Sequence, residues 1–97
     1  MLDNCDIAIL TRLNELAERH GLKPYDFVAT VRHDPNSPNA ILSFEDPAQG
    51  NALREERYGK MLQSLGVGAD DTLTAPYAQV IDALDNALQQ APRPRRY

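Results

Sequence analysis

The 97-residue sequence has a single cysteine, Cys5, and no tryptophan. One cysteine cannot form a disulfide within its own chain, which excludes the disulfide-rich class of secreted domains. The sequence also lacks long apolar runs. Its first such run, residues 7–10, is too short for a membrane span, and no basic residue precedes it as in a secretory signal. We therefore expect a cytoplasmic protein that does not bind membranes.

Positive charge is also scarce in this chain. Lys and Arg number 10 against 14 Asp and Glu, a net charge of −4, so we do not expect nucleic acid as a partner. Arg outnumbers Lys eight to two, and Ala and Leu supply 12 residues each, a composition that favours a bacterial origin. The hydrophobic fraction of 42% is ordinary for a globular protein. The length predicts one domain, which we assign to residues 1–91.

The first element predicted from the sequence is a helix over residues 4–20. Its apolar side chains recur every three or four positions, which is the spacing of one helix face. Gly21 suits the left-handed position after the last turn, and Leu22 can fold back onto the helix. Pro24 prevents the helix from continuing, so both its apolar face and its end are indicated by the sequence.

Two segments that follow are rich in β-branched and aromatic residues. In residues 26–33 the apolar positions alternate with Thr30 and Arg32, and in residues 40–45 a second alternation follows. The polar loop between them contains prolines and predicts a turn. We therefore expect an antiparallel hairpin.

The second half of the sequence predicts two more helices. The first begins at Asp46 or is delayed until Asn51 caps it, and it ends at Gly66. The last helix is expected to have Thr74 as its cap and Pro76 in its first turn. Its apolar face is Tyr77, Val80, Ile81, Leu84, Ala87 and Leu88.

These elements define an α+β fold in the order α-β-β-α-α, with the hairpin packed against three helices. A hairpin with helices on one face leaves open strand edges, which invite pairing with another strand. The second strand lacks lysine and proline, so we expect it to bind a protein partner or a second copy of the chain through Ala40, Ile41, Leu42, Ser43 and Phe44.

Residues 92–97 alternate proline with arginine and predict a disordered basic tail. Its arginines could also contact an acidic partner. We therefore add Arg93, Arg95 and Arg96 to the candidate partner-binding residues.

Residues 16–32 support an alternative function. Ala17 is followed four residues later by Gly21, and six residues after that by the apolar Phe27. This spacing resembles the helix-turn-helix of bacterial repressors, which implies a DNA-binding regulator with a recognition helix at residues 25–32. However, residues 1–33 carry five acids against four bases, and residues 25–32 favour a strand. A helix that ends at glycine before a strand explains the pattern better.

Enzymatic and metal-binding patterns are missing from the sequence. The only histidines are His20 and His33, and neither lies in a paired spacing typical of zinc ligands. Cys5 and His20 would lie about 22 Å apart along one helix, too far for a nucleophile and its base. We therefore predict no catalytic residues, no cofactor and no metal, and keep an unrecognised enzyme as the third possibility. Our first interpretation is a small accessory or regulatory module that acts by binding a protein partner or itself.

Overall fold

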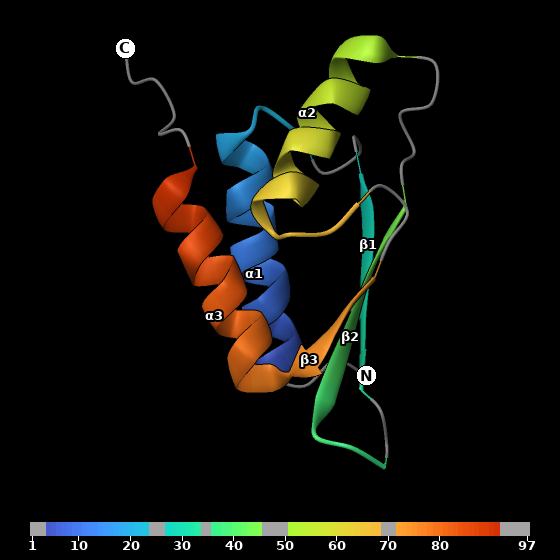
Figure 1. Ribbon diagram of the computed structural model, residues 1–97, viewed down its shortest axis with the longest axis vertical. Coiled ribbons are helices and arrows are strands. Elements are labelled where there is room, and N and C mark those ends of the chain that lie inside the picture. Colours follow the sequence, from blue (N-terminus) through green and yellow to red (C-terminus); the bar gives the residue numbers. More distant parts are fainter. Residues whose placement is uncertain (1–3, 24–26, 34–35, 46–50, 69–71, 92–97) are drawn as a thin grey trace.

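The computed structural model describes residues 4–23, 27–33, 36–45, 51–68 and 72–91 (Figure 1). Three helices and three strands follow one another as α1 (Asn4–Arg19), β1 (Val28–His33), β2 (Asn39–Glu45), α2 (Ala52–Ser64), β3 (Thr72–Pro76) and α3 (Tyr77–Gln90). The predicted α+β class and the three helices are confirmed. The structure adds β3 to the predicted order. The proposed tail, residues 92–97, lies outside the described residues.

The strands form one antiparallel sheet in the order β1-β2-β3. The predicted hairpin is confirmed, because β1 pairs with β2 in a register that places Val31 opposite Leu42. On its other side β2 pairs with β3, where Leu42 lies opposite Leu73. β2 is therefore the central strand, with a neighbour on each side.

β3 occupies residues that the sequence pattern assigns to the start of the last helix. The predicted cap is wrong: Pro76, not Thr74, precedes the helix, which begins at Tyr77 without a side-chain cap. Along β3 the side chains alternate between exposed and half-buried, as in a strand with one face on the core. The alternation is confined to five residues, too short to reveal a strand without knowledge of β2, the strand it pairs with.

Helices α1 and α3 lie side by side on one face of the sheet and run in the same direction (Figure 1). Nε of Arg12 on α1 donates to Oδ1 of Asp85 on α3 at 2.7 Å. Further along both helices, Nη1 of Arg19 donates to the main-chain oxygen of Leu88. α1 contacts β1, whereas α3 contacts β2 and β3. The helix pair therefore follows the order of the strands beneath it.

The core lies between the inner face of the sheet and the helices. On β2, the buried positions Ala40, Leu42 and Phe44 alternate with the half-buried Ile41 and Ser43, as the sequence predicts. The helices meet this face with side chains that are almost entirely buried, among them Ile9, Leu13, Leu16, Tyr58, Met61, Leu62, Val80 and Leu84.

The ends of α2 follow local sequence signals. The Asn51 side chain accepts a hydrogen bond from the backbone N–H of Arg54 at 3.2 Å, so the later of the two predicted starts is correct. At the other end Gly66 adopts a positive φ of 76°. The N–H of Val67 then bonds to the Leu62 oxygen at 3.1 Å, and the Val67 side chain packs against the core.

Candidate functional site

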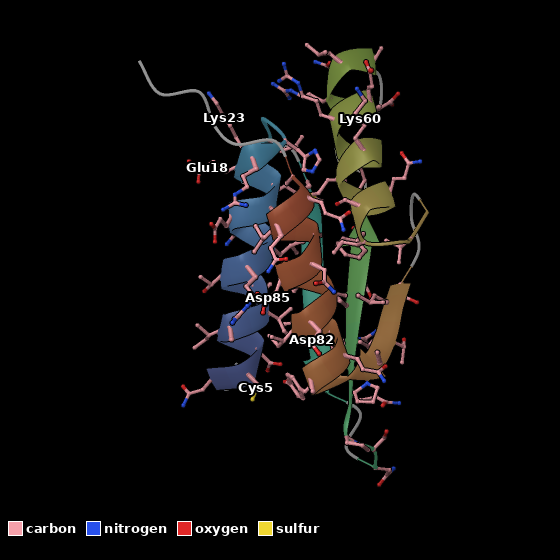
Figure 2. All side chains as sticks on the ribbon, turned by 60° about the vertical axis from the view of Figure 1, so that its left-hand side comes forward. Cys5, Glu18, Lys23, Lys60, Asp82 and Asp85 are labelled. Atoms are coloured by element: carbon pink, nitrogen blue, oxygen red, sulfur yellow. The ribbon has the colours of Figure 1, made fainter. Side chains whose placement is uncertain are left out.

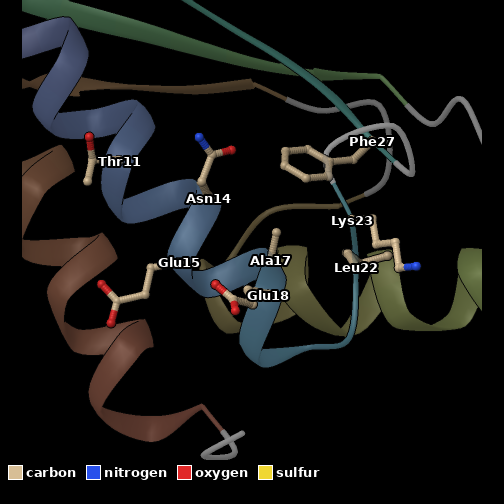
Figure 3. Close-up of a pocket in the computed structure, with 8 residues that line it drawn as sticks. All are labelled: Thr11, Asn14, Glu15, Ala17, Glu18, Leu22, Lys23 and Phe27. Atoms are coloured by element: carbon tan, nitrogen blue, oxygen red, sulfur yellow. The ribbon is translucent and has the colours of Figure 1, made fainter.

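A cavity of about 500 Å³ opens between α1 and the segment that leads into β1 (Figure 3). In Figure 3, Leu22, Lys23 and Phe27 lie on the side of α1 away from α3, whereas Thr11 and Glu15 lie on the side nearer to α3. The lining of the cavity comes from two stretches of the chain, α1 and the residues around its C-terminal turn: Thr11, Asn14, Glu15, Ala17, Glu18, Leu22, Lys23 and Phe27. A cavity of this size, with an apolar floor and a few polar groups, is the usual form of a binding site.

The turn after α1 shapes the cavity. The N–H of Gly21 donates to the Glu18 oxygen at 2.9 Å, and the N–H of Leu22 donates to the Ala17 oxygen at 2.9 Å. This pair of hydrogen bonds is the Schellman motif at a helix C-terminus. The motif needs a positive φ at the first residue after the helix cap, and Gly21 has a φ of 78°. The predicted helix end is thus confirmed. Nη1 of Arg57 on α2 donates to the Gly21 oxygen at 3.3 Å and ties the turn to α2.

The floor of the cavity is apolar. The three apolar lining residues are almost fully buried, with exposed fractions of 1% for Ala17, 4% for Leu22 and 7% for Phe27. Only a small part of each side chain borders the cavity, and the rest packs in the core. Leu22 is placed there by the turn at Gly21, and Phe27 comes just before the first residue of β1. The core contacts that stabilise the fold therefore also fix the position of the cavity floor.

The rim of the cavity is polar, and its groups differ in whether they bond to other residues of the chain. The Glu15 carboxylate bonds to Nη2 of Arg19 at 2.9 Å, and the Thr11 hydroxyl donates to the Ile7 oxygen at 2.7 Å. The Glu18 carboxylate, by contrast, makes no hydrogen bond or ion pair with any residue in the described ranges. Glu18 is exposed and lines the cavity, and Figure 3 shows its side chain on the last turn of α1. It is the acidic group most available to a ligand.

The structure does not support the edge predicted at Ala40–Phe44. Because β2 pairs with β1 and with β3, the backbone of Ala40–Ser43 has strands of its own chain on both sides, and Phe44 pairs with Ala29 of β1. Ala40, Leu42 and Phe44 face the core, while Ile41 and Ser43 lie on the opposite face of the sheet. The prediction of a free edge on β2 is wrong because β3 pairs with the side of β2 that was expected to bind a partner. Arg93, Arg95 and Arg96 lie outside the described residues.

The helix-turn-helix resemblance ends at the turn. Its second helix would cover residues 25–32, but residues 28–33 form β1. The spacing of Ala17, Gly21 and Phe27 has another structural role. Ala17 and Phe27 form the cavity floor, and Gly21 supplies the turn between them. The spacing that marks the cavity was therefore visible in the sequence, where it correctly indicated a helix that ends at glycine before a strand but did not indicate a cavity.

The histidine and cysteine positions form no shared site in the described part of the chain. Cys5 is exposed in the first turn of α1, whereas His20 follows its last residue. Nε2 of His20 is buried without a hydrogen-bond partner. Burial lowers the pKa of His20, and the positive charge of Lys60 lowers it further. No group of three His, Cys, Asp or Glu side chains among the described residues could hold a metal ion.

Comparison with known proteins gives no assignment. No protein-family model matches the chain, and no curated protein or solved structure is detectably similar to it. Among the described residues, no helix combines the length and the apolar character needed to cross a bilayer.

Proposed function

We propose that this protein is a binding module whose cavity receives an arginine or lysine side chain from a basic segment of a partner protein. The observation that carries the proposal is the Glu18 carboxylate, which has no partner among the described residues and stands at the rim of an apolar-floored cavity. A basic side chain matches both parts, because it joins an aliphatic stem to a charged head. The stem would contact Leu22 and Phe27, and the head would bond to Glu18.

The charge of the whole chain supports the same kind of partner. A net charge of −4 attracts a basic segment and raises the rate at which it encounters the protein. The eight lining residues include no histidine and no cysteine, so we propose binding without chemistry at this site. We place the module in a reducing cytoplasm, since its single cysteine, Cys5, is a free thiol.

A titration followed by NMR tests the proposal. The probe is the blocked tripeptide acetyl-Gly-Arg-Gly-amide, compared with the same peptide carrying norleucine in place of arginine. The arginine peptide should shift the amide signals of Ala17, Leu22 and Phe27 in a saturable way, with a dissociation constant in the millimolar range that one side chain can supply. The norleucine peptide should bind more weakly because it lacks the charge.

Two variants with the same change in net charge complete the experiment. Glu18→Gln should weaken binding of the arginine peptide, because it removes the charge at the rim. Asp82→Asn is the matched control, since Asp82 is exposed on α3, away from the cavity. Equal weakening by both variants would show attraction by net charge alone and would contradict the proposed site. Unchanged binding by Glu18→Gln would contradict it as well.

A further inference from the structure

The outer side of β3 is a strand edge without a partner strand in the described part of the chain. Figure 2 shows β3, in orange, at the outside of the sheet, on the opposite side of the helix layer from α1. An edge strand is open to pairing with another chain unless charged side chains or proline guard it. β3 carries no charged side chain, and its proline, Pro76, is its last residue. The other edge strand, β1, carries the exposed Arg32.

The flank of α3 beside this edge is also free of charge. Asp85, which bonds to Arg12, marks the side of α3 that faces α1. At 3.6 residues per turn, the opposite side, next to β3, carries three uncharged residues. These are the half-buried Ala83 and the exposed Gln79 and Gln90.

This neutral surface contrasts with the rest of the protein. A quarter of the residues are charged, and with a net charge of −4 two copies repel each other at long range. Like charges that face each other across paired strands are destabilising. A surface related to itself by a two-fold axis avoids that cost when it is uncharged, so the β3 edge and the α3 flank are suited to a second copy of the same chain.

We propose that a second copy of this chain pairs with β3 in antiparallel orientation, with Thr74 of one copy opposite Thr74 of the other. In this register Leu73 of each copy lies opposite Ala75 of the other copy. Leu73 and Ala75 are half-buried on the core side of the sheet. A large side chain thus meets a small one twice, and each apolar side chain that the monomer leaves partly exposed gains cover.

The positions of the helices fit the same arrangement. α3 contacts both β3 and β2 on the core side of the sheet, so pairing of β3 with its copy would bring two α3 helices to the same face of the joined sheet. Ala83, the small residue of the flank, permits this approach.

Light scattering from low to high micromolar concentration tests the proposal. The full chain should form a dimer, and Thr74→Lys should raise its dissociation constant by about tenfold or more, because two lysines then face each other. Thr30→Lys is the matched control, since Thr30 is an exposed threonine on the other edge strand. It should leave the dimer intact.

A second pair of variants acts on the helix flank and does not alter the sheet. Ala83→Glu should also weaken the dimer, whereas Gln89→Glu, on a different side of α3, should not. Circular dichroism checks that each variant is folded, and if Thr74→Lys does not fold, Ala83→Glu decides. A chain that stays monomeric, or a dimer that Thr30→Lys disrupts and Ala83→Glu does not, overturns the proposal. None of these changes touches the cavity beside α1.

Discussion

The hydroxyl of Tyr77 donates a hydrogen bond to Oδ1 of Asp6 at 2.6 Å and joins the first residue of α3 to the first turn of α1. At 4% exposure, Asp6 is the only buried charged side chain in the described part of the protein. Because the two helices run in the same direction, their N-termini lie at the same end of the helix layer (Figure 1). The positive ends of both helix dipoles therefore favour a carboxylate at this position.

Tyr77→Phe should lower the free energy of unfolding by about 1.5–3 kcal/mol, because a buried carboxylate loses a hydrogen-bond donor. Urea denaturation measures the change. A cycle with Asp6→Asn and the double variant isolates the interaction between the two side chains. If the effects of the two single variants simply add, the hydrogen bond does not couple the helices.

Leu84→Ala should destabilise the protein by about 2–5 kcal/mol, since Leu84 is fully buried between α3 and the sheet and its removal leaves a cavity. Thermal and urea denaturation both report this loss. Gln89→Ala, at an exposed position of the same helix, should change the stability by less than about 0.5 kcal/mol. A Leu84→Ala variant as stable as the Gln89→Ala variant would place the core elsewhere.

Two glycines of similar surroundings should respond in opposite directions to alanine. Neither Gly59 nor Gly66 has an atom within 4 Å of the position that a Cβ would take, so sterics do not separate them. Gly66 has a φ of +76°, and Gly66→Ala should cost about 1–2 kcal/mol. Gly59 lies within α2, where Gly59→Ala should stabilise by about 0.5–1 kcal/mol. A Gly66→Ala variant as stable as the parent protein would contradict the cost of the positive φ at the end of α2.

His20 should make the stability depend on pH. Its pKa is lowered from 6.5 in the folded protein, first by burial and then by Lys60, so the unfolded chain binds a proton more readily. The free energy of unfolding should therefore fall as the pH drops through 6.5, and the loss should end below the folded pKa. Urea denaturation at a series of pH values measures the slope.

His20→Asn should remove this part of the slope, and Lys60→Gln should keep most of it, because burial is the larger cause. An identical slope in the parent protein and in His20→Asn would show that other groups produce it.

Local signals in the sequence determined several features of the structure. The ends of α1 and α2 follow from Gly21, Gly66 and the Asn51 cap, since a positive φ and a capping hydrogen bond involve only near neighbours. The hairpin and the buried face of β2 follow from alternation of apolar residues, which has a period of two in any strand with one face on a core. The α+β class follows from these elements.

The cavity was only half visible in the sequence. The spacing of Ala17, Gly21 and Phe27 stood out because small residues at such positions allow segments to approach closely. The same spacing serves a helix followed by a helix or a helix followed by a strand. The choice depends on whether the segment after the turn finds a strand to pair with, as β1 does with β2.

Tertiary structure alone decided that residues 72–76 form a strand, and that the open edge lies on β3 and not on β2. Thr72–Pro76 is too short for its alternation to predict a strand from the sequence. The segment becomes a strand because β2 supplies hydrogen-bond partners and the core supplies an apolar surface for Leu73. That pairing moves the open edge from β2 to β3. It also begins α3 at Tyr77, beside Asp6, a residue 71 positions earlier in the chain. Such contacts depend on distant segments meeting in the folded chain, and no local pattern of residues encodes them.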